Sequence, residues 1–444
     1  MKESYTRQLA KFACNARFED IPSDVIQHLK LWILDDLGCG IYGSTMEWGI
    51  ILSDYIHSFD KNEECTIWGT QFRSTASNAA LVNATMVHGL DLDSTHPHVQ
   101  SHLGSVAFTS ALALAEHKGG INGKDFLTAV AIGYELFIRL AVCCGITLFR
   151  RGFYPTGACG PIGSAAAAAK LLESNEEEML NTFGISTSFH SGFSPAHLTM
   201  VKRLFVGKAA ESGVIAAQLA SKGFTGIKDI LDEESGVFCK ALCDDYNLST
   251  LTDGLGEEYE IRNVEFKDYP CVGTIPTALD AVGEIQHEHS FDVESIKKVS
   301  IKISNFAKEH TGWKYNPESI IAAQRNMYYC VATRLIEGDF FVDQLSPKKL
   351  TDPKLLRLID LIDISADSEL ETLTAVVEVD LKSGERFSRR VDHHKPMTYE
   401  DIKKKFKRLA LKRIDSNKAT SVIAMVERLE DVKDLRELSQ LLVP

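Results

Sequence analysis

The chain has 444 residues, of which 44% are hydrophobic, 25% charged and 9% aromatic. These proportions are those of folded globular proteins and exclude the disordered and fibrous classes, and the length allows two or three domains or one large domain with an insertion. The 48 basic and 61 acidic side chains give a net charge of −13, which argues against a nucleic-acid-binding protein and against one that binds an anionic membrane surface.

Residues 1 to about 256 carry a helical pattern. Apolar residues recur at spacings of three and four, for example in 25–37, 79–90 and 126–142. The alanines at 165–169 are small enough to let neighbouring helices approach closely. This part of the chain is therefore predicted to form a tightly packed helical bundle.

The most hydrophobic stretch, 126–149, contains Glu135 and Arg139, which a membrane-spanning helix rarely tolerates, and the first residues carry no apolar signal region. The ten cysteines lack the density and short even spacings of a secreted disulfide scaffold, and no zinc or iron–sulfur spacing occurs. We therefore expect a cytoplasmic protein with reduced thiols, no membrane segment and no metal.

After about residue 260 the pattern changes. Val299, Ile301 and Ile303 alternate with polar residues, and the same alternation recurs at 377–381. This period of two is typical of β-strands with one buried face. Because helical spacings occur between the two stretches, this region is predicted to form an α+β domain.

Helical spacing returns from Thr398, which predicts that the C-terminal segment folds back onto the first domain. Thr398 and Asp401 are spaced as a capping box, so the basic run at 403–413 is interpreted as the solvated face of one helix rather than a polyanion site. The predicted fold is mainly α, with a large all-helical domain at 1–262 and 395–444 and an inserted α+β lid domain at 263–394.

The densest group of chemically capable side chains lies at 91–102, between two helical patterns. Two carboxylates, several hydroxyls and three imidazoles occur within these twelve residues. Side chains on such a loop can converge on one cavity, where imidazole titrates near neutrality and a carboxylate can fix its tautomer. A polar loop with capping aspartates is the structural alternative, but the cluster as a whole favours acid–base chemistry. Its candidate residues are Asp91, Asp93, Thr95 and His102.

Two further motifs could bind an anion. The segment from Tyr154 to Gly157 precedes a small-residue helix, whose first backbone NH groups offer a seat for a carboxylate or phosphate near Thr156. Lys202 and Arg203 are adjacent near a helix start and could supply positive charge to an anionic substrate. Each motif alone is compatible with an ordinary helix start or a surface basic pair. No glycine-rich nucleotide-binding pattern follows a strand.

Short motifs occur over nearly the whole chain, at 67–69, 81–83, 88–95, 102–104, 153–156, 199–202, 207–210, 223–226, 269–270 and 323–329. Their residues and their order resemble the MmgE/PrpD family, which includes 2-methylcitrate dehydratase, cis-aconitate decarboxylase and iminodisuccinate epimerase. The resemblance implies a helical main domain with an inserted lid, usually in a homodimer without a cofactor. It also implies an active site between the domains, to which Asp91, Thr95, His102, Lys202 and Tyr329 contribute.

Two positions depart from the family pattern. Tyr154 stands where the decarboxylase and dehydratase branches usually have His, and no His follows the Tyr-Pro pair within 269–280. A phenol has a reference pKa near 10, against about 6.5 for imidazole, so Tyr154 would deliver protons differently. The epimerase-like branch can pair a tyrosine with a lysine, and this chain retains both in Tyr154 and Lys202.

The predicted function is cofactor-independent acid–base chemistry on a small di- or tricarboxylate. Lys202, helped by His102 and by backbone NH groups near Thr156, would stabilise the negative charge that develops beside a carboxylate. Tyr154 or His102 would move a proton, and Asp91 would orient a neighbour. The predicted catalytic residues are His102, Tyr154, Lys202 and Asp91, and the predicted substrate-binding residues are Thr95, Asp93, Thr156, Arg203 and Tyr329.

The expected reaction is that of a lyase, either a dehydratase or a decarboxylase. An iminodisuccinate epimerase-like isomerase is the alternative from the same family, and a non-catalytic carboxylate-binding or scaffold protein is the alternative from another class. Metal-dependent hydrolysis would instead require a metal ion on Asp91, Asp93, His96, His98 and His102. The expected partners are a small polycarboxylate and a second copy of the chain, with no nucleic acid and no membrane.

Overall fold

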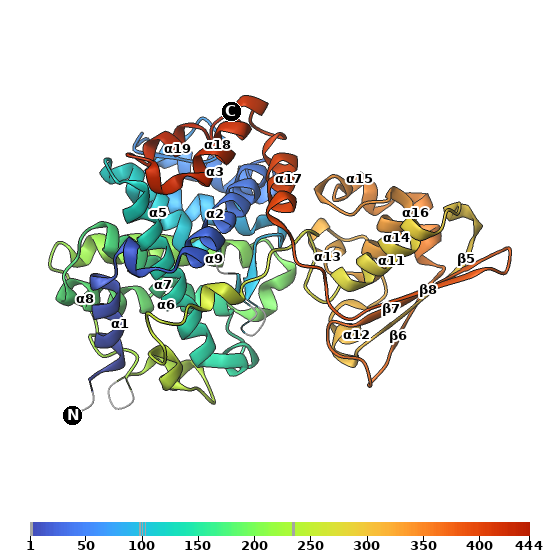
Figure 1. Cartoon of the computed structure of the whole chain (residues 1–444), viewed down its shortest axis with the longest axis horizontal. Helices are drawn as coiled ribbons and strands as arrows, with labels where there is room; N and C mark the ends of the chain where they lie inside the picture. The colour runs from blue at the N-terminus through green and yellow to red at the C-terminus, as the bar shows by residue number, and fades with distance from the viewer. Residues whose placement is uncertain (1–2, 97–98, 100, 103, 233–235) are drawn as a thin grey trace. The chain divides into compact units, whose positions relative to one another are not determined.

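The computed structural model describes residues 3–96, 99, 101–102, 104–232 and 236–444. Helices make up 59% of it, and a mixed four-stranded sheet lies in the C-terminal region, which confirms the prediction of a mainly α protein. The chain divides into two compact units (Figure 1). The helical unit consists of Met1–Gly89, Asp93–Phe266 and Met397–Pro444, and the mixed unit of Leu90–Leu92 and Lys267–Pro396.

The helical unit contains the long helices. They are α1 (Tyr5–Asn15), α2 (Ser23–Gly43), α3 (Glu47–Phe59), α4 (Ala76–Val87), α5 (Gly104–Lys118), α6 (Gly123–Arg150), α7 (Pro155–Leu171), α8 (Glu176–Thr187), α9 (Val201–Ala220), α10 (Phe238–Leu242), α17 (Tyr399–Ala410), α18 (Ser416–Glu427) and α19 (Arg436–Gln440). Two short hairpins join β1 (Cys65–Thr66) to β2 (Arg73–Ser74) and β3 (Thr95–His96) to β4 (Ser101–His102). The C-terminal helices α17 and α18 pack on α2 (Figure 1).

Small residues allow α6 and α7 to pack closely. A Cβ atom on Gly133 would lie 2.7 Å from the carbonyl oxygen of Gly163, and one on Gly163 would lie 2.6 Å from that of Gly133. Only glycine therefore fits at this crossing, as close helix packing requires. The alanines at 165–169 are fully buried along the same helix. This packing fixes the start of α7, where Tyr154 is the N-cap residue.

On length and composition alone α6 could cross a membrane, but most of this helix is buried inside the helical unit. Its charged pair explains why the apolar stretch is interrupted. Arg139 Nε donates to Glu135 Oε1 at 2.6 Å, and its other nitrogens donate to the carbonyl oxygens of Thr250, Asp253 and Glu258. Because buried charges require such partners, the pair holds a loop of the helical unit in place.

Helix α17 begins with the capping box predicted for Thr398 and Asp401. The Lys404 side chain is 73% exposed, as expected of a solvated face. Lys405, however, is 3% exposed, and its Nζ lies 2.6 Å from Oδ1 of the buried Asp35 on α2. The interpretation of the whole basic run as a solvated face is therefore wrong for Lys405, which the helical turn directs toward α2.

The mixed unit is organised around a sheet with strand order β6-β5-β7-β8, in which β5 is parallel to β6 and antiparallel to β7. Val299, Ile301 and Ile303 on β5 are buried, which confirms their predicted alternation. Helix α11 packs against β7 and β8 (Figure 1). The elements are α11 (Pro276–Glu288), β5 (Ile296–Ile303), α12 (Asn305–Thr311), α13 (Ile320–Ala323), α14 (Met327–Glu337), α15 (Pro347–Leu350), α16 (Pro353–Ile359), β6 (Ile362–Ala366), β7 (Ala375–Leu381) and β8 (Arg386–Val391).

Candidate active site

The chain between α4 and α5 brings two histidines to one aspartate in the helical unit. His88 follows the last residue of α4, and Thr95 of β3 pairs with His102 of β4, so the hairpin returns His102 toward Asp93. His88 Nδ1 lies 3.0 Å from Asp93 Oδ2, and His102 Nδ1 lies 3.1 Å from Asp93 Oδ1. The two imidazole rings are 4.3 Å apart. One carboxylate therefore holds both imidazoles.

Tyr154 extends this cluster from the start of α7. Its hydroxyl lies 3.1 Å from His88 Nε2, within hydrogen-bond distance. Lys202 Nζ on α9 lies 5.8 Å from the centre of the Tyr154 ring. Thr156 Oγ1 accepts a 3.0 Å hydrogen bond from the backbone N of His102. The structure thus brings a phenol, two imidazoles, a carboxylate and an ammonium group together from three segments of the chain.

Burial and mutual contact decide the charges of His88 and Asp93. Desolvation lowers the pKa of His88 to about 3, although the Asp93 carboxylate acts in the opposite direction. For Asp93, burial raises the pKa, but interactions with His102 and His88 outweigh it and hold the pKa below its usual range. His88 is therefore neutral beside an ionised Asp93. This favours the tautomer in which Nδ1–H donates to Asp93 and Nε2 accepts from Tyr154.

Exposure divides the cluster into two layers. His88 and Asp93 are 1% and 0% exposed, whereas Tyr154, His102 and Lys202 are 7%, 8% and 6% exposed. The outer three side chains therefore keep a small contact with solvent, which His88 and Asp93 lack almost entirely. The inner pair supports them without direct access to solvent.

Arg203 is also buried, but its guanidinium is bound to the protein. Nε donates to the Gly89 carbonyl oxygen at 2.8 Å, Nη1 donates to that of Thr199 at 3.2 Å, and the group lies 4.5 Å from the Trp48 ring. These contacts fix the backbone beside His88. They explain Arg203 as a structural residue, so we leave it out of the proposed substrate-binding set.

Thr95 also contributes through its backbone. Its N donates to the Glu265 carbonyl oxygen at 3.0 Å, and its own carbonyl oxygen accepts from Glu265 N at 2.9 Å. This bridge anchors the β3–β4 hairpin on which His102 lies. Its contribution to the site is thus to hold the hairpin in register.

Asp91 and Tyr329 lie in the mixed unit. Asp91 has a left-handed backbone conformation with φ of 56°, which is uncommon for a non-glycine residue and often marks a functional site. Lys267 Nζ lies 3.4 Å from Asp91 Oδ1, and Arg325 Nη1 lies 4.0 Å from its Oδ2. Tyr329 is fully buried, and its hydroxyl donates to the Gln344 carbonyl oxygen at 2.7 Å. We therefore leave Tyr329 out of the proposed site.

Sequence reasoning gave no role to His88, Lys267 or Arg325. His88 is part of a family-like motif and lies five residues before Asp93, which is the only local signal for it. Lys267 is a single lysine at the start of the mixed unit, and Arg325 follows α13. Their proximity to Asp91 depends on contacts between segments far apart in the sequence, which no local pattern reveals.

Among the described residues of the helical unit, one group could hold a metal ion. The ligand atoms of His88, Asp93 and His102 all lie within 4.8 Å of one another, and two imidazoles with one carboxylate are a known ligand set for divalent transition metals. His96 is directed elsewhere, since its Nε2 lies 3.4 Å from Glu260. His98, the further ligand considered for a metal site, lies outside the described residues.

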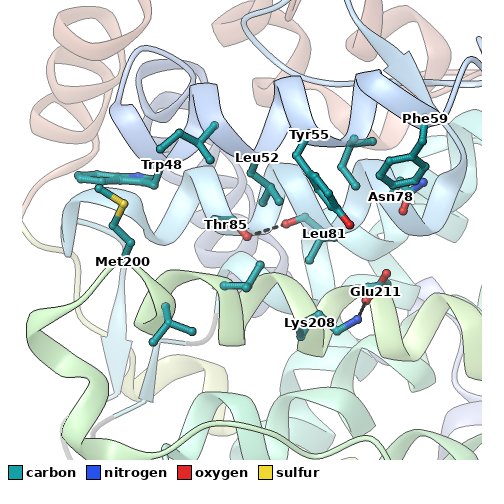
Figure 2. Close-up of a pocket in the computed structure, with 14 residues that line it drawn as sticks. Trp48, Leu52, Tyr55, Phe59, Asn78, Leu81, Thr85, Met200, Lys208 and Glu211 are labelled. Carbon is teal, nitrogen blue, oxygen red and sulfur yellow. Dashed lines mark hydrogen bonds and ion pairs between the residues drawn. The ribbon is translucent and has the colours of Figure 1, made fainter.

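An open groove of about 600 Å³ lies along α3, α4 and α9 of the same unit (Figure 2). Its lining is mainly apolar, as the side chains of Leu52, Tyr55 and Phe59 show. The charged lining residues, Lys208 and Glu211, form an ion pair with each other. The groove therefore does not supply the acid–base groups that the His88 cluster provides.

Comparison with known proteins agrees with the predicted resemblance. Residues 7–250 match the MmgE/PrpD N-terminal domain and residues 269–431 match the MmgE/PrpD C-terminal domain. The chain is 28% identical over 466 residues to the cis-aconitate decarboxylase-like protein oryM of Aspergillus oryzae, which covers 98% of this chain and 97% of that protein. It is 28% identical over 464 residues to the cis-aconitate decarboxylase of Homo sapiens, with 100% and 95% covered. It is 26% identical over 470 residues to that of Aspergillus terreus, with 98% and 96% covered. The chain belongs to the MmgE/PrpD family.

Proposed function

We propose that the protein is a cofactor-independent carboxylate lyase that acts on a small di- or tricarboxylate by general acid–base chemistry. The observation that carries the proposal is the chain of contacts from Asp93 through His88 to Tyr154, with Lys202 beside the phenol. Relatives that share nearly the full length of the chain are cis-aconitate decarboxylases, which favours loss of carbon dioxide over loss of water.

The proposed reaction places developing negative charge next to Lys202. When a carbon–carbon bond of the substrate breaks, carbon dioxide leaves and the electron pair stays on carbon, where a neighbouring carboxylate or double bond delocalises it. A buried ammonium group stabilises such charge more strongly than water does. The Tyr154 hydroxyl then gives its proton to that carbon, and the resulting phenolate takes a proton from water.

His88 and Asp93 position Tyr154, which is the proposed acid. Neutral His88 accepts a hydrogen bond from the Tyr154 hydroxyl in the resting enzyme and so fixes the orientation of the phenol, whose ring centre lies 5.8 Å from Lys202 Nζ. Asp93 maintains the required tautomer of His88 by accepting Nδ1–H. His102, held at the hairpin by Thr156, is the second group of the outer layer that can contact a substrate carboxylate.

An epimerase-like isomerase is the second candidate, and the Tyr154–His88 contact is the observation that favours it. With its hydroxyl directed at His88 Nε2, Tyr154 can act as a base: its oxygen takes a proton from carbon while its own proton passes to His88. Asp93 would stabilise the imidazolium. Lys202 would then return a proton to the opposite face of the carbon.

A substrate panel in deuterated water tests the proposal. Purified protein would be incubated with cis-aconitate, 2-methylcitrate and iminodisuccinate and followed by NMR. Loss of carbon dioxide, loss of water and deuterium exchange without bond loss are distinct outcomes, and the first or second supports a lyase. Deuterium exchange alone supports the isomerase.

A pair of matched lysine variants tests whether any observed turnover depends on the proposed site. Lys202→Met should abolish turnover while the circular dichroism spectrum stays unchanged, and Lys404→Met, which changes an exposed lysine, should have no effect. Ligand binding without turnover of any of the three compounds would contradict the proposal and support a non-catalytic carboxylate-binding protein.

A further inference from the structure

Five of the ten cysteines gather at one place in the helical unit. They come from α6, α7 and the region of α10, and all five are buried. The Sγ atoms of Cys143 and Cys239 are 3.8 Å apart, although the two residues are 96 positions apart in the sequence. The cluster consists of Cys143, Cys144, Cys159, Cys239 and Cys243.

The thiols interact with one another. The Cys144 thiol interacts with those of Cys159, Cys239 and Cys243. Cys143 and Cys144 lie directly before Gly145, whose φ of 55° and ψ of −160° interrupt α6. Because the helix is broken there, two adjacent side chains can both approach α10, which an unbroken helix with 100° between neighbours would hinder.

The cluster favours pairwise sulfur chemistry over a metal centre. Among the described residues, the groups with metal-competent spacing are His88 with Asp93 and His102, and Asp268 with Asp280 and His394, and no cysteine belongs to either. Even with a divalent cation, four thiolates would leave net negative charge in a buried region. Two thiols in contact need only a small approach to reach the bond length of about 2.05 Å of a disulfide.

Cys239 is the member of the cluster whose thiolate form is favoured by its neighbours. Hydrogen bonds from the Cys143 and Cys144 thiols lower the pKa of Cys239, although burial acts in the opposite direction. The pKa of Cys143 is raised by its hydrogen bond to Cys239 and by burial. A thiolate is the form that reacts with oxidants and with other sulfur atoms. Cys239 is thus the attacking sulfur, with Cys143 next to it as the resolving thiol.

We propose that Cys143 and Cys239 form a reversible disulfide that links α6 to α10 when the protein meets hydrogen peroxide. The Cys239 thiolate attacks one peroxide oxygen, the oxygen–oxygen bond breaks, and the hydroxide released takes a proton to become water. Cys239 is then a sulfenic acid. The Cys143 sulfur displaces its hydroxyl, which leaves as water with the Cys143 proton. Two electrons pass from the two sulfur atoms to the peroxide.

The disulfide should act on stability rather than on the proposed site. The contacts of the Cys143 and Cys239 sulfur atoms are with other thiols, not with the His88 cluster. A bond that closes a loop of this length restricts the unfolded chain strongly. We expect the oxidised protein to melt roughly 5 °C higher than the reduced protein, and dithiothreitol to reverse the change.

Peptide mapping tests the proposal. The full chain would be reduced, freed of reductant, treated with hydrogen peroxide, alkylated after denaturation and digested without reduction. We expect two thiols to escape alkylation and a peptide that joins the segment of Cys143 to that of Cys239. Because Cys144 lies on the same peptide as Cys143, the Cys144→Ser variant should keep the crosslink and the Cys143→Ser variant should lose it.

Controls make the outcome decisive. Cys65, a buried cysteine whose thiol donates to the Ala113 carbonyl oxygen, lies outside the cluster, so Cys65→Ser should leave the crosslink in place. Alkylation of all ten thiols in the treated wild-type protein would overturn the proposal. So would a crosslink that persists in Cys239→Ser or that joins Cys144 to Cys159. If a variant fails to fold, the number of alkylated thiols and the crosslinked peptide in the wild-type protein decide the question.

Discussion

Two histidines beside aspartates differ in charge between the two units: His88 is neutral and His394 is a cation. His88, in the helical unit, is fully buried against Asp93, and burial lowers its pKa to about 3. His394, in the mixed unit, keeps 21% of its side chain exposed and lies 2.9 Å from Asp268 and 2.6 Å from Asp280. Burial lowers the pKa of His394 too, but the two carboxylates outweigh it and raise the pKa to about 10.

The comparison shows that burial and the number of carboxylates decide the use of an imidazole. With one carboxylate and no solvent, His88 stays neutral and can accept a hydrogen bond from the Tyr154 hydroxyl. With two carboxylates, His394 is a fixed cation that links segments of the mixed unit. These ion pairs with Asp268 and Asp280 hold the His394 side chain in place.

Among the variants that compare the two units, replacement of the phenol should have the largest effect. Tyr154→Phe removes the group that contacts His88 Nε2 and should lower kcat about 1000-fold, because a positioned acid or base contributes this much. Steady-state kinetics on the substrate found by the panel measures the change. Tyr329→Phe is the matched control, since it removes a buried hydroxyl from the mixed unit and should change kcat less than about twofold. Equal effects of the two variants would remove Tyr154 from the mechanism.

The second largest effect is expected for Asp93→Asn, which tests the tautomer of His88. In Asp93→Asn an amide can donate to Nδ1, which would move the proton to Nε2 and prevent it from accepting from Tyr154. We expect kcat to fall about 100-fold while KM changes little. Asp268→Asn makes the same substitution beside His394 and should leave kcat within about twofold. A wild-type kcat in Asp93→Asn would show that the inner layer does not support Tyr154.

The smallest effect is expected for a substitution of His394, which should change the stability of the protein in a pH-dependent way. Because the pKa of His394 is raised to about 10 in the folded protein from about 6.5 when unfolded, its stabilisation is fully present below about pH 6.5 and is lost as pH rises through about 10. His394→Gln should therefore cost about 2 kcal/mol at neutral pH and progressively less toward pH 10. Urea unfolding of both proteins across this range measures the difference. A cost that does not change with pH would contradict the assigned charge.

The parts of the fold that the sequence predicts are those with a local repeat. The alternation of Val299, Ile301 and Ile303 predicts a strand because the side-chain period of a strand is visible in consecutive residues. Similarly, Thr398 and Asp401 form a capping box because both partners lie within one turn. Lys405 shows the limit of such patterns. Its buried partner Asp35 is on another helix, so the basic run gives no sign that one lysine turns inward.

In the site, too, contacts between residues close in sequence could be predicted, and contacts between distant segments could not. Asp93 and His102 are close in sequence, and a short hairpin brings them together, so the cluster could be predicted as a group. The partner of His88 at its other ring nitrogen is Tyr154, 66 residues away, and this contact depends on the packing of α7. The sequence therefore identifies the outer groups more readily than the residue that links them.

The neutral state of His88 is the central claim, and nitrogen NMR of the imidazole tests it most directly. Protein labelled with ¹⁵N-histidine would be followed between about pH 5 and pH 8, with the His88 signals assigned by their loss in His88→Gln. We expect His88 to stay neutral across this range, with its proton on Nδ1. Titration of the His88 signals near pH 6.5, or a proton found on Nε2, would contradict the account.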